Sequence, residues 1–157
     1  MRRSLWIVAC LVCVGSGTAH AQSRGFGLGL IVGEPTGLSA KLWQSRTTAL
    51  DFAAAWSFTD EAALHLHGDF LVHNFRLIRV ERGQLPVYYG IGLRVKMSDE
   101  EQHDDTSLGL RIPVGLDYLF ARGTPLDIFM EIVPILDLVP NTDVTLNASL
   151  GVRYWFH

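Results

Sequence analysis

Side chains of opposite character alternate along most of this chain. Between residues 107 and 120, every even-numbered position from Leu108 to Phe120 is apolar or aromatic, whereas the odd-numbered positions include Gly109 and Arg111. A period of two places successive side chains on opposite faces of a β-strand. The same split recurs in one segment after another, which predicts an all-β chain whose strands each have one apolar and one polar face.

Eight strands are predicted, with turn residues between them. We expect them at residues 25–33, 37–44, 47–57, 62–74, 85–97, 107–120, 126–137 and 144–156. An even number of strands, most of them about ten residues or longer, fits antiparallel strands that cross a membrane at a tilt. Beyond the N-terminal segment there is no run of about 18 apolar residues, which excludes a helical membrane protein.

The two faces differ in chemistry along all eight strands. The apolar face is aliphatic and ends in aromatic residues. The opposite face carries polar and ionisable side chains, which are Lys41, Asp51, His65, His67, Asp69, Arg94, Lys96, Arg111, Asp117, Asp127, Glu131, Asn147 and Arg153. Seven glycines are interleaved with them, namely Gly27, Gly29, Gly90, Gly92, Gly109, Gly115 and Gly151. The five basic and five acidic residues of this face suit a closed interior in which each charge has a partner.

Two kinds of barrel produce such alternation, and they differ in which face points inward. A soluble ligand-binding barrel of the lipocalin kind has an apolar interior. Here the polar face offers little to line an apolar pocket, and small glycines beside charged residues fit the narrow interior of an eight-stranded barrel. We therefore expect an eight-stranded antiparallel up-and-down transmembrane β-barrel with a polar, side-chain-filled interior, closed because unpaired strand edges are costly in lipid.

The N-terminus has the order of a secretory signal peptide. Arg2 and Arg3 precede an apolar run from Leu5 to Val14, and a small-x-small triplet ends at Ala21. The run of ten apolar residues is too short for a membrane-spanning helix, which needs about 20. We expect cleavage after Ala21, so that residues 1–21 are the signal peptide and residues 22–157 the barrel domain. A rival interpretation is a lipoprotein acylated at Cys10.

Removing the signal peptide changes the chemistry of the chain. Both cysteines, Cys10 and Cys13, lie within residues 1–21, so the exported chain cannot form a disulfide. Arg2 and Arg3 are the only charged residues of that segment, so the net charge goes from −3 to −5. A nucleic-acid partner is not expected, because it calls for clustered basic surface.

The final strand carries a resemblance to a known group of proteins. Residues 147–156, Asn-Ala-Ser-Leu-Gly-Val-Arg-Tyr-Trp-Phe, look like the terminal strand of outer-membrane barrels, although His157 follows the last aromatic residue. The mature chain, including residues 33–39 and 88–94, resembles short outer-membrane barrels similar in architecture to the OmpA transmembrane domain and OmpX. This resemblance implies a location in the bacterial outer membrane, contact with its lipid, and assembly by the barrel-assembly machinery. It implies no reaction.

Two features could carry chemistry. His65, His67 and Asp69 lie on one face of a strand, but neighbours on that face are about 7 Å apart, so they are interpreted as interior residues bonded to nearby charges and not as metal ligands. The acidic stretch from Ser98 to Thr106 is expected to be an extracellular loop. Solvated charge is the simplest interpretation of it, with a cation or another extracellular ligand as the alternative.

The sequence therefore predicts a monomeric outer-membrane barrel with a structural or surface-interaction role, without catalysis, cofactor or metal. The alternatives are a narrow pore or small-solute conduit and, less favoured, a lipid-modifying enzyme or a soluble ligand-binding barrel. Ser39 and Ser149 are expected to point inward, and the lipid face has no Ser–His pair. Pro113 and Pro134 fit poorly inside strands. The segment 75–84 is long for a periplasmic turn, and we expect strands to extend into it.

Overall fold

The structure, a computed structural model, describes residues 25–57, 63–100, 103–121 and 123–156. Within these residues it contains nine β-strands and no helix that is long and apolar enough to cross a membrane. The strands are β1 (Phe26–Glu34), β2 (Thr36–Trp43), β3 (Thr48–Ser57), β4 (Ala63–Asn74), β5 (Val87–Glu100), β6 (His103–Arg111), β7 (Val114–Leu119), β8 (Leu126–Val139) and β9 (Asp143–Phe156). The predicted signal peptide and its cleavage site lie outside the described residues.

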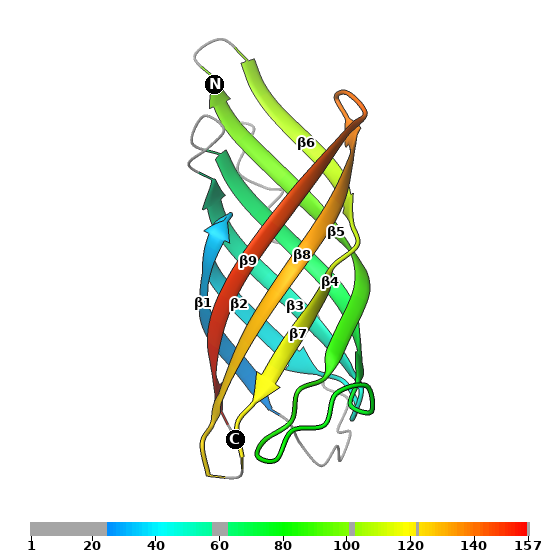
Figure 1. The fold of residues 1–157 in the computed structure, drawn as a ribbon. Coiled ribbons are helices and arrows are strands. Elements are labelled where there is room, and N and C mark those ends of the chain that lie inside the picture. The colour runs from blue at the N-terminus through cyan, green and yellow to red at the C-terminus, as the bar shows by residue number, and fades with distance from the viewer. Residues whose placement is uncertain (1–24, 58–62, 101–102, 122, 157) are drawn as a thin grey trace.

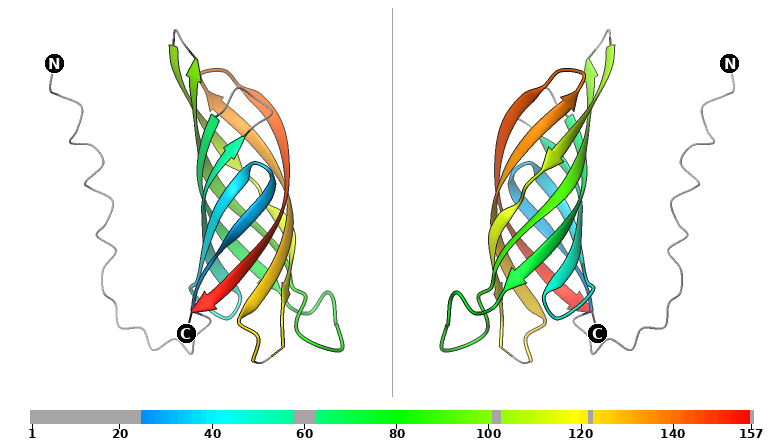
Figure 2. Two further views of the ribbon diagram at one scale, coloured as in Figure 1. Left: turned by 90° about the vertical axis from the view of Figure 1, so that its left-hand side faces the viewer. Right: turned by 90° about the vertical axis from the view of Figure 1, so that its right-hand side faces the viewer.

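The strands form one closed antiparallel ring (Figures 1 and 2). Consecutive strands pair from β1 through to β5, and β9 pairs with β1 from Phe26↔Phe156 to Glu34↔Ala148. The remaining wall is completed by β5, β6, β7, β8 and β9. Because the last strand pairs with the first, the sheet has no open edge along its main body. The predicted up-and-down barrel is confirmed.

The nine strands form an eight-stranded barrel, because β6 and β7 are two parts of one long strand. Their pairing with β5 keeps the same register on both sides of the break, from Gly92↔Arg111 to Tyr89↔Val114. Pro113 lies opposite Gly90 and accepts its N–H, and Pro134 likewise accepts the N–H of Ile112. Neither proline can donate a hydrogen bond in return. The ladder therefore loses two bonds at one place, and the strand is interrupted there without changing direction.

Two expectations about the connections between strands are wrong. Strands do not extend into residues 75–84: β4 ends at Asn74 and β5 begins at Val87, and the segment between them keeps a single bridge, from Gln84 to Leu119. The acidic stretch predicted as a loop instead belongs to a hairpin in which Ser98 pairs with Asp105 and Glu100 with His103. The alternation that fixes strands elsewhere is weak in both segments, because one mixes Arg with apolar residues and the other is almost wholly polar.

The two faces of the wall lie as the alternation predicts. Along β8, positions alternate between buried and exposed from Asp127 to Leu136, and the exposed positions are Ile128, Met130, Ile132, Pro134 and Leu136. Ile91, Leu93 and Leu150 on other strands are also more than half exposed. The outer surface is therefore a belt of aliphatic and aromatic side chains, whereas the charged side chains point into the lumen, the space enclosed by the ring.

Glycine pairs with a larger inward side chain across the strands of the barrel. Each of the seven glycines assigned to the polar face lies directly opposite such a residue, in the pairs Gly27↔Trp155, Gly29↔Arg153, Gly90↔Leu71, Gly92↔Asp69, Gly109↔Asp137, Gly115↔Tyr88 and Gly151↔Phe129. A Cβ atom at any of them would press on the side chain opposite. Because glycine has no side chain, the large residue opposite it has room inside the narrow barrel, and such pairs fill the lumen.

Gly92→Ala should destabilise the barrel by about 1–3 kcal/mol, because the added methyl collides with the Asp69 carboxylate and the Gly68 carbonyl oxygen. Gly68→Ala is the matched control: its methyl points outward to within 3.2 Å of the Phe52 ring, which is exposed and can move. Its cost should stay within about 0.5 kcal/mol. Urea unfolding of both variants in lipid vesicles measures the difference, and equal costs would contradict the packing described here.

Candidate functional site

The predicted interior residues do lie in the lumen. Those that are buried are Lys41, Asp51, His65, His67, Asp69, Arg94, Arg111, Asp117, Asp127, Glu131 and Arg153, together with Asn147. Lys96, nearer one end of the barrel, is only half-buried. They come from every strand from β2 to β9, so the polar residues of the lumen are spread around the ring.

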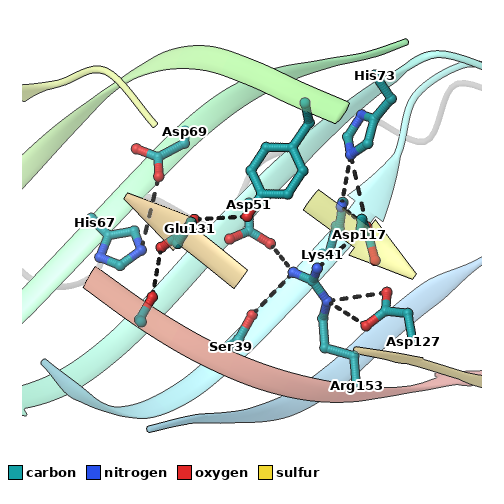
Figure 3. A network of polar contacts seen from close by, with 12 residues as sticks. Ser39, Lys41, Asp51, His67, Asp69, His73, Asp117, Asp127, Glu131 and Arg153 are labelled. Carbon is teal, nitrogen blue, oxygen red and sulfur yellow. Dashed lines mark hydrogen bonds and ion pairs between the residues drawn. The ribbon is translucent and has the colours of Figure 1, made fainter. Parts of the chain in front are cut away.

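Arg153 on β9 is the centre of the largest cluster (Figure 3). Its Nε donates to both carboxylate oxygens of Asp127 at 3.1 and 3.3 Å, the residue directly opposite on β8. One terminal nitrogen of the guanidinium donates to Asp51 at 2.7 Å, and the other lies 3.6 Å from Asp117. The guanidinium carbon also lies 3.9 Å from the centre of the Phe129 ring. One cation therefore links strands on opposite sides of the lumen.

Lys41 on β2 is the second cation of this cluster. Its Nζ donates to Asp117 at 2.6 Å and lies 2.9 Å from Nε2 of His73, and neither the lysine nor the aspartate side chain is exposed. The rings of Trp43 and Tyr88 flank the ammonium group at 5.1 and 5.2 Å from their centres. A fully buried lysine is tolerated here because it has an anion, an imidazole and two aromatic faces around it.

Arg111 organises a second group in the middle of the barrel. Its Nε donates to both oxygens of Asp69 at 3.0 and 3.2 Å, and a terminal nitrogen lies 3.7 Å from Glu131. Glu131 also accepts hydrogen bonds from the hydroxyls of Tyr88 at 3.0 Å and Ser149 at 3.1 Å. These two carboxylates are therefore held by arginine and by neutral donors together.

A third group lies toward the end where β5 and β6 project. Arg94 donates to Asp137 at 2.6 Å, and the hydroxyl of Thr145 reaches the same carboxylate at 3.4 Å. Asp137 is not among the predicted interior residues, although it lies on the same face of the strand as Asp127 and Glu131. It sits at the boundary predicted for that strand, where the inward or outward direction of a side chain is least certain.

Large aromatic residues of the lumen are the other members that sequence reasoning missed. Trp43, Tyr88, Phe129 and Trp155 are all buried inside the ring. Trp155 donates its indole N–H to Asp127 at 3.0 Å and packs with Trp43 near the barrel end where β9 finishes. The signal was present in the alternation, because each aromatic residue shares its parity with a neighbouring lumen charge or glycine.

The histidines of β4 raise the question of a metal. The sequence analysis did not interpret His65, His67 and Asp69 as metal ligands, but in the structure one ligand atom each of Asp51, His67 and Asp69 lie within 4.8 Å of one another. Asp51 faces Asp69 directly across β3 and β4, a neighbour that the sequence order hides. Both carboxylates are already paired, Asp51 with Arg153 and Asp69 with Arg111. A metal ion would have to compete with two guanidinium groups.

Side chains of the described part of the lumen pack closely around one small hollow. A small hollow between Glu34, Arg111 and Asn147 is too tight for a water molecule to sit in it. Ser39 is buried and faces the Arg153 guanidinium at 3.4 Å, and Ser149 is bonded to Glu131, so neither serine is paired with a histidine. Within the described residues, this arrangement holds side chains in place and offers no activated nucleophile.

Comparison with known proteins agrees with the architecture. The sequence matches no protein-family profile and no curated protein sequence. Among solved structures, the N-terminal β-barrel domain of Pseudomonas aeruginosa OprF aligns with a TM-score of 0.62 at 14% identity, over 83% of this chain and 96% of that one. The chain has the fold of a small outer-membrane β-barrel. Neisserial surface protein A (NspA) also aligns, with a TM-score of 0.47 at 14% identity over 83% of this chain and 93% of its own.

Arg111→Leu should destabilise the barrel by about 3–5 kcal/mol, because it leaves the buried Asp69 carboxylate without its arginine. Adding Asp69→Asn should recover part of that loss. Adding Asp117→Asn instead should recover none, because that carboxylate belongs to Lys41 and Arg153. Urea unfolding of the single and double variants in lipid vesicles tests this, and equal recovery by both second changes would refute the pairing.

Proposed function

We propose that this protein is an integral barrel of the bacterial outer membrane that does not conduct and that serves a structural or surface-interaction role. The observation that carries this proposal is the inversion of the usual soluble pattern. Aliphatic and aromatic side chains cover the outside of a closed ring, whereas ion pairs fill its inside. Only lipid, or a detergent in its place, stabilises such an outer surface, because a soluble monomer rarely exposes so large an apolar area.

The filled lumen favours a barrel that does not conduct, and it argues against a pore. Arg153 spans the space between β9, β8 and β3, and Lys41, Tyr88 and Phe129 pack against the same cluster. An ion passing through would have to displace these side chains and separate buried charges, each step costing several kcal/mol. A wide aqueous channel calls for about 16 strands, twice the number of walls here.

The two ends of the barrel differ in a way that supports a role at the surface. β5 and β6 project beyond the neighbouring strands as a two-stranded hairpin (Figures 1 and 2). Among the residues that the structure describes, β5 pairs only with β6 beyond the pair Ser98↔Ala63. If both termini face the periplasm, this hairpin stands outside the cell and carries the acidic stretch from Ser98 to Thr106. A cation or a basic partner is the ligand that its composition favours.

Ile112→Arg tests whether the apolar belt faces lipid. Ile112 is 49% exposed at the middle of the wall, and a basic residue there should cost about 2–4 kcal/mol and reduce the heat-modifiable folded form in membranes. Val144→Arg is the matched control, because Val144 is exposed on the same outer face near a strand end, where the expected cost is about 0–1 kcal/mol. If wild-type protein folds to a soluble monomer without detergent, or if the two variants behave alike, the membrane assignment is wrong.

Planar-bilayer recording tests the closed lumen. Because the Arg153 and Lys41 clusters block the axis, purified barrel should give no steady single-channel current under conditions in which a porin control conducts. Steady currents that scale with the amount of barrel inserted would favour the alternative function, a narrow pore or small-solute conduit.

A further inference from the structure

The exposed basic residues gather at one end of the barrel. Among the described residues, the arginines and lysines that lie outside the lumen are Arg46, Arg76, Arg79 and Arg82. Arg46 lies in the connection between β2 and β3, and the other three lie between β4 and β5, at the end where β1 begins and β9 finishes (Figure 1). Every lysine and arginine that the structure describes is thus either in the lumen or at this end.

The segment of residues 75–86 is the longest connection at that end, and it is tied to the wall at both of its sides. Phe75 packs on Trp43 inside the barrel mouth. At the far side, the backbones of Gln84 and Leu119 exchange two hydrogen bonds of 2.9 and 2.8 Å, and the Tyr118 hydroxyl donates to the Arg82 carbonyl at 3.1 Å. Between these ties the segment projects sideways beyond the barrel wall (Figure 2).

Apolar and basic side chains are mixed within this projecting segment. Leu77 is 64% exposed and Val80 is 37% exposed, while Arg76, Arg79 and Arg82 are exposed around them. A loop that met only water would gain nothing from presenting a leucine and a valine. Apolar side chains flanked by arginines are the composition of a segment that rests at a lipid–water interface, with its charges at the level of the headgroups.

The part of the barrel wall beside this segment also has the composition of a lipid–water interface. Exposed aromatic residues gather at this end of the belt, where Phe26 stacks with Phe156, Tyr154 contacts Phe156, and Tyr118 contacts Phe120. Aromatic residues of barrels concentrate where the hydrocarbon meets the headgroups. Tyr118 joins this aromatic group and, through its hydroxyl, the projecting segment. The segment therefore leaves the wall at the level of the aromatic residues and extends along the membrane plane.

We infer that residues 75–86 form an interfacial anchor that binds the phosphate groups of anionic phospholipids through Arg76, Arg79 and Arg82, with Leu77 and Val80 inserted among the acyl chains. This inference rests on the proposed membrane location. Arginine suits the ligand, because its guanidinium donates two hydrogen bonds to a phosphate and keeps its charge at any pH that the protein meets. The anchor would set the depth and tilt of the barrel according to the lipid beside it.

A fluorescent label at position 80 tests the anchor directly. The full chain, carrying Val80→Cys with Cys10→Ser and Cys13→Ser, is labelled with an environment-sensitive dye, folded in detergent and placed in nanodiscs. The discs contain phosphatidylcholine alone or phosphatidylcholine mixed with phosphatidylglycerol of the same acyl chains. Emission should shift to the blue as the phosphatidylglycerol fraction rises, and added salt should weaken the shift.

Two single variants distinguish an effect of this segment from an effect of the total positive charge at this end of the barrel. Arg79→Gln should weaken the response by about fivefold, which corresponds to the roughly 1 kcal/mol that one basic residue contributes near an anionic surface. Arg46→Gln removes the same charge from the same end, but from a connection whose other residues, Gln44, Ser45 and Thr47, are polar. It should leave the response within about twofold of the parent protein, which is less than half of one basic residue's contribution in free energy.

Each other outcome overturns the inference in a distinguishable way. If the emission wavelength does not change with the phosphatidylglycerol fraction, although the protein shows the heat-dependent gel shift of a folded barrel, the anchor alone is refuted. Equal losses from Arg79→Gln and Arg46→Gln would assign the effect to general charge at this end. The same blue shift produced by inorganic phosphate in phosphatidylcholine discs would indicate a site for free anions. Failure of the parent protein to fold into detergent or lipid would refute the membrane location itself.

Discussion

The pairing of β9 with β1 is the constraint on which the rest of this structure depends. It runs over nine residue pairs, from Phe26↔Phe156 to Glu34↔Ala148, and leaves the main wall without an edge. Lipid offers no hydrogen-bond partner, so a spanning sheet must close. A closed barrel of only eight strands has a narrow interior. The volume of the side chains therefore limits which residues can face the lumen as much as their charge does. The seven pairs of glycine with a large residue are the consequence.

The buried charges are better understood as a consequence of this architecture than as its source of stability. Replacing a buried ion pair by apolar residues is often neutral or stabilising, because desolvation offsets the attraction between the charges. In this barrel the outer face is apolar, and the buried charged side chains are all on the inner face. Arg153 on β9, through its bond to Asp51, is linked to β3, a strand with which β9 shares no backbone hydrogen bond. Such links favour one register of the ring over slipped alternatives, which an apolar interior would tolerate.

The alternation of the sequence was enough to predict the strands, the two faces and the lumen position of residues such as Lys41 and Arg111, because each depends only on a period of two. It could not predict partners. Arg111 pairs with Asp69 on β4 and lies near Glu131 on β8, and neither partner follows from the alternation, because pairing across the lumen depends on the stagger of the strands around the ring. Asp137 was missed at a strand boundary. Residues 75–86 and the acidic hairpin were misjudged because neither carries a clean alternation.

The three lumen groups also bear on how the barrel can respond to its surroundings. The Arg153 and Lys41 cluster lies near the end where β9 finishes, the Arg111 group lies in the middle, and Arg94 with Asp137 lies toward the projecting hairpin. Each group is satisfied largely within itself, yet Tyr88 touches two of them, through Glu131 and through the Lys41 ammonium. Separating Arg94 from Asp137 would therefore break that pair without breaking the hydrogen bonds of Arg111 or Arg153. To conduct, all three groups would have to separate together, and the summed cost of separating buried pairs makes that far less favourable than movement at one end.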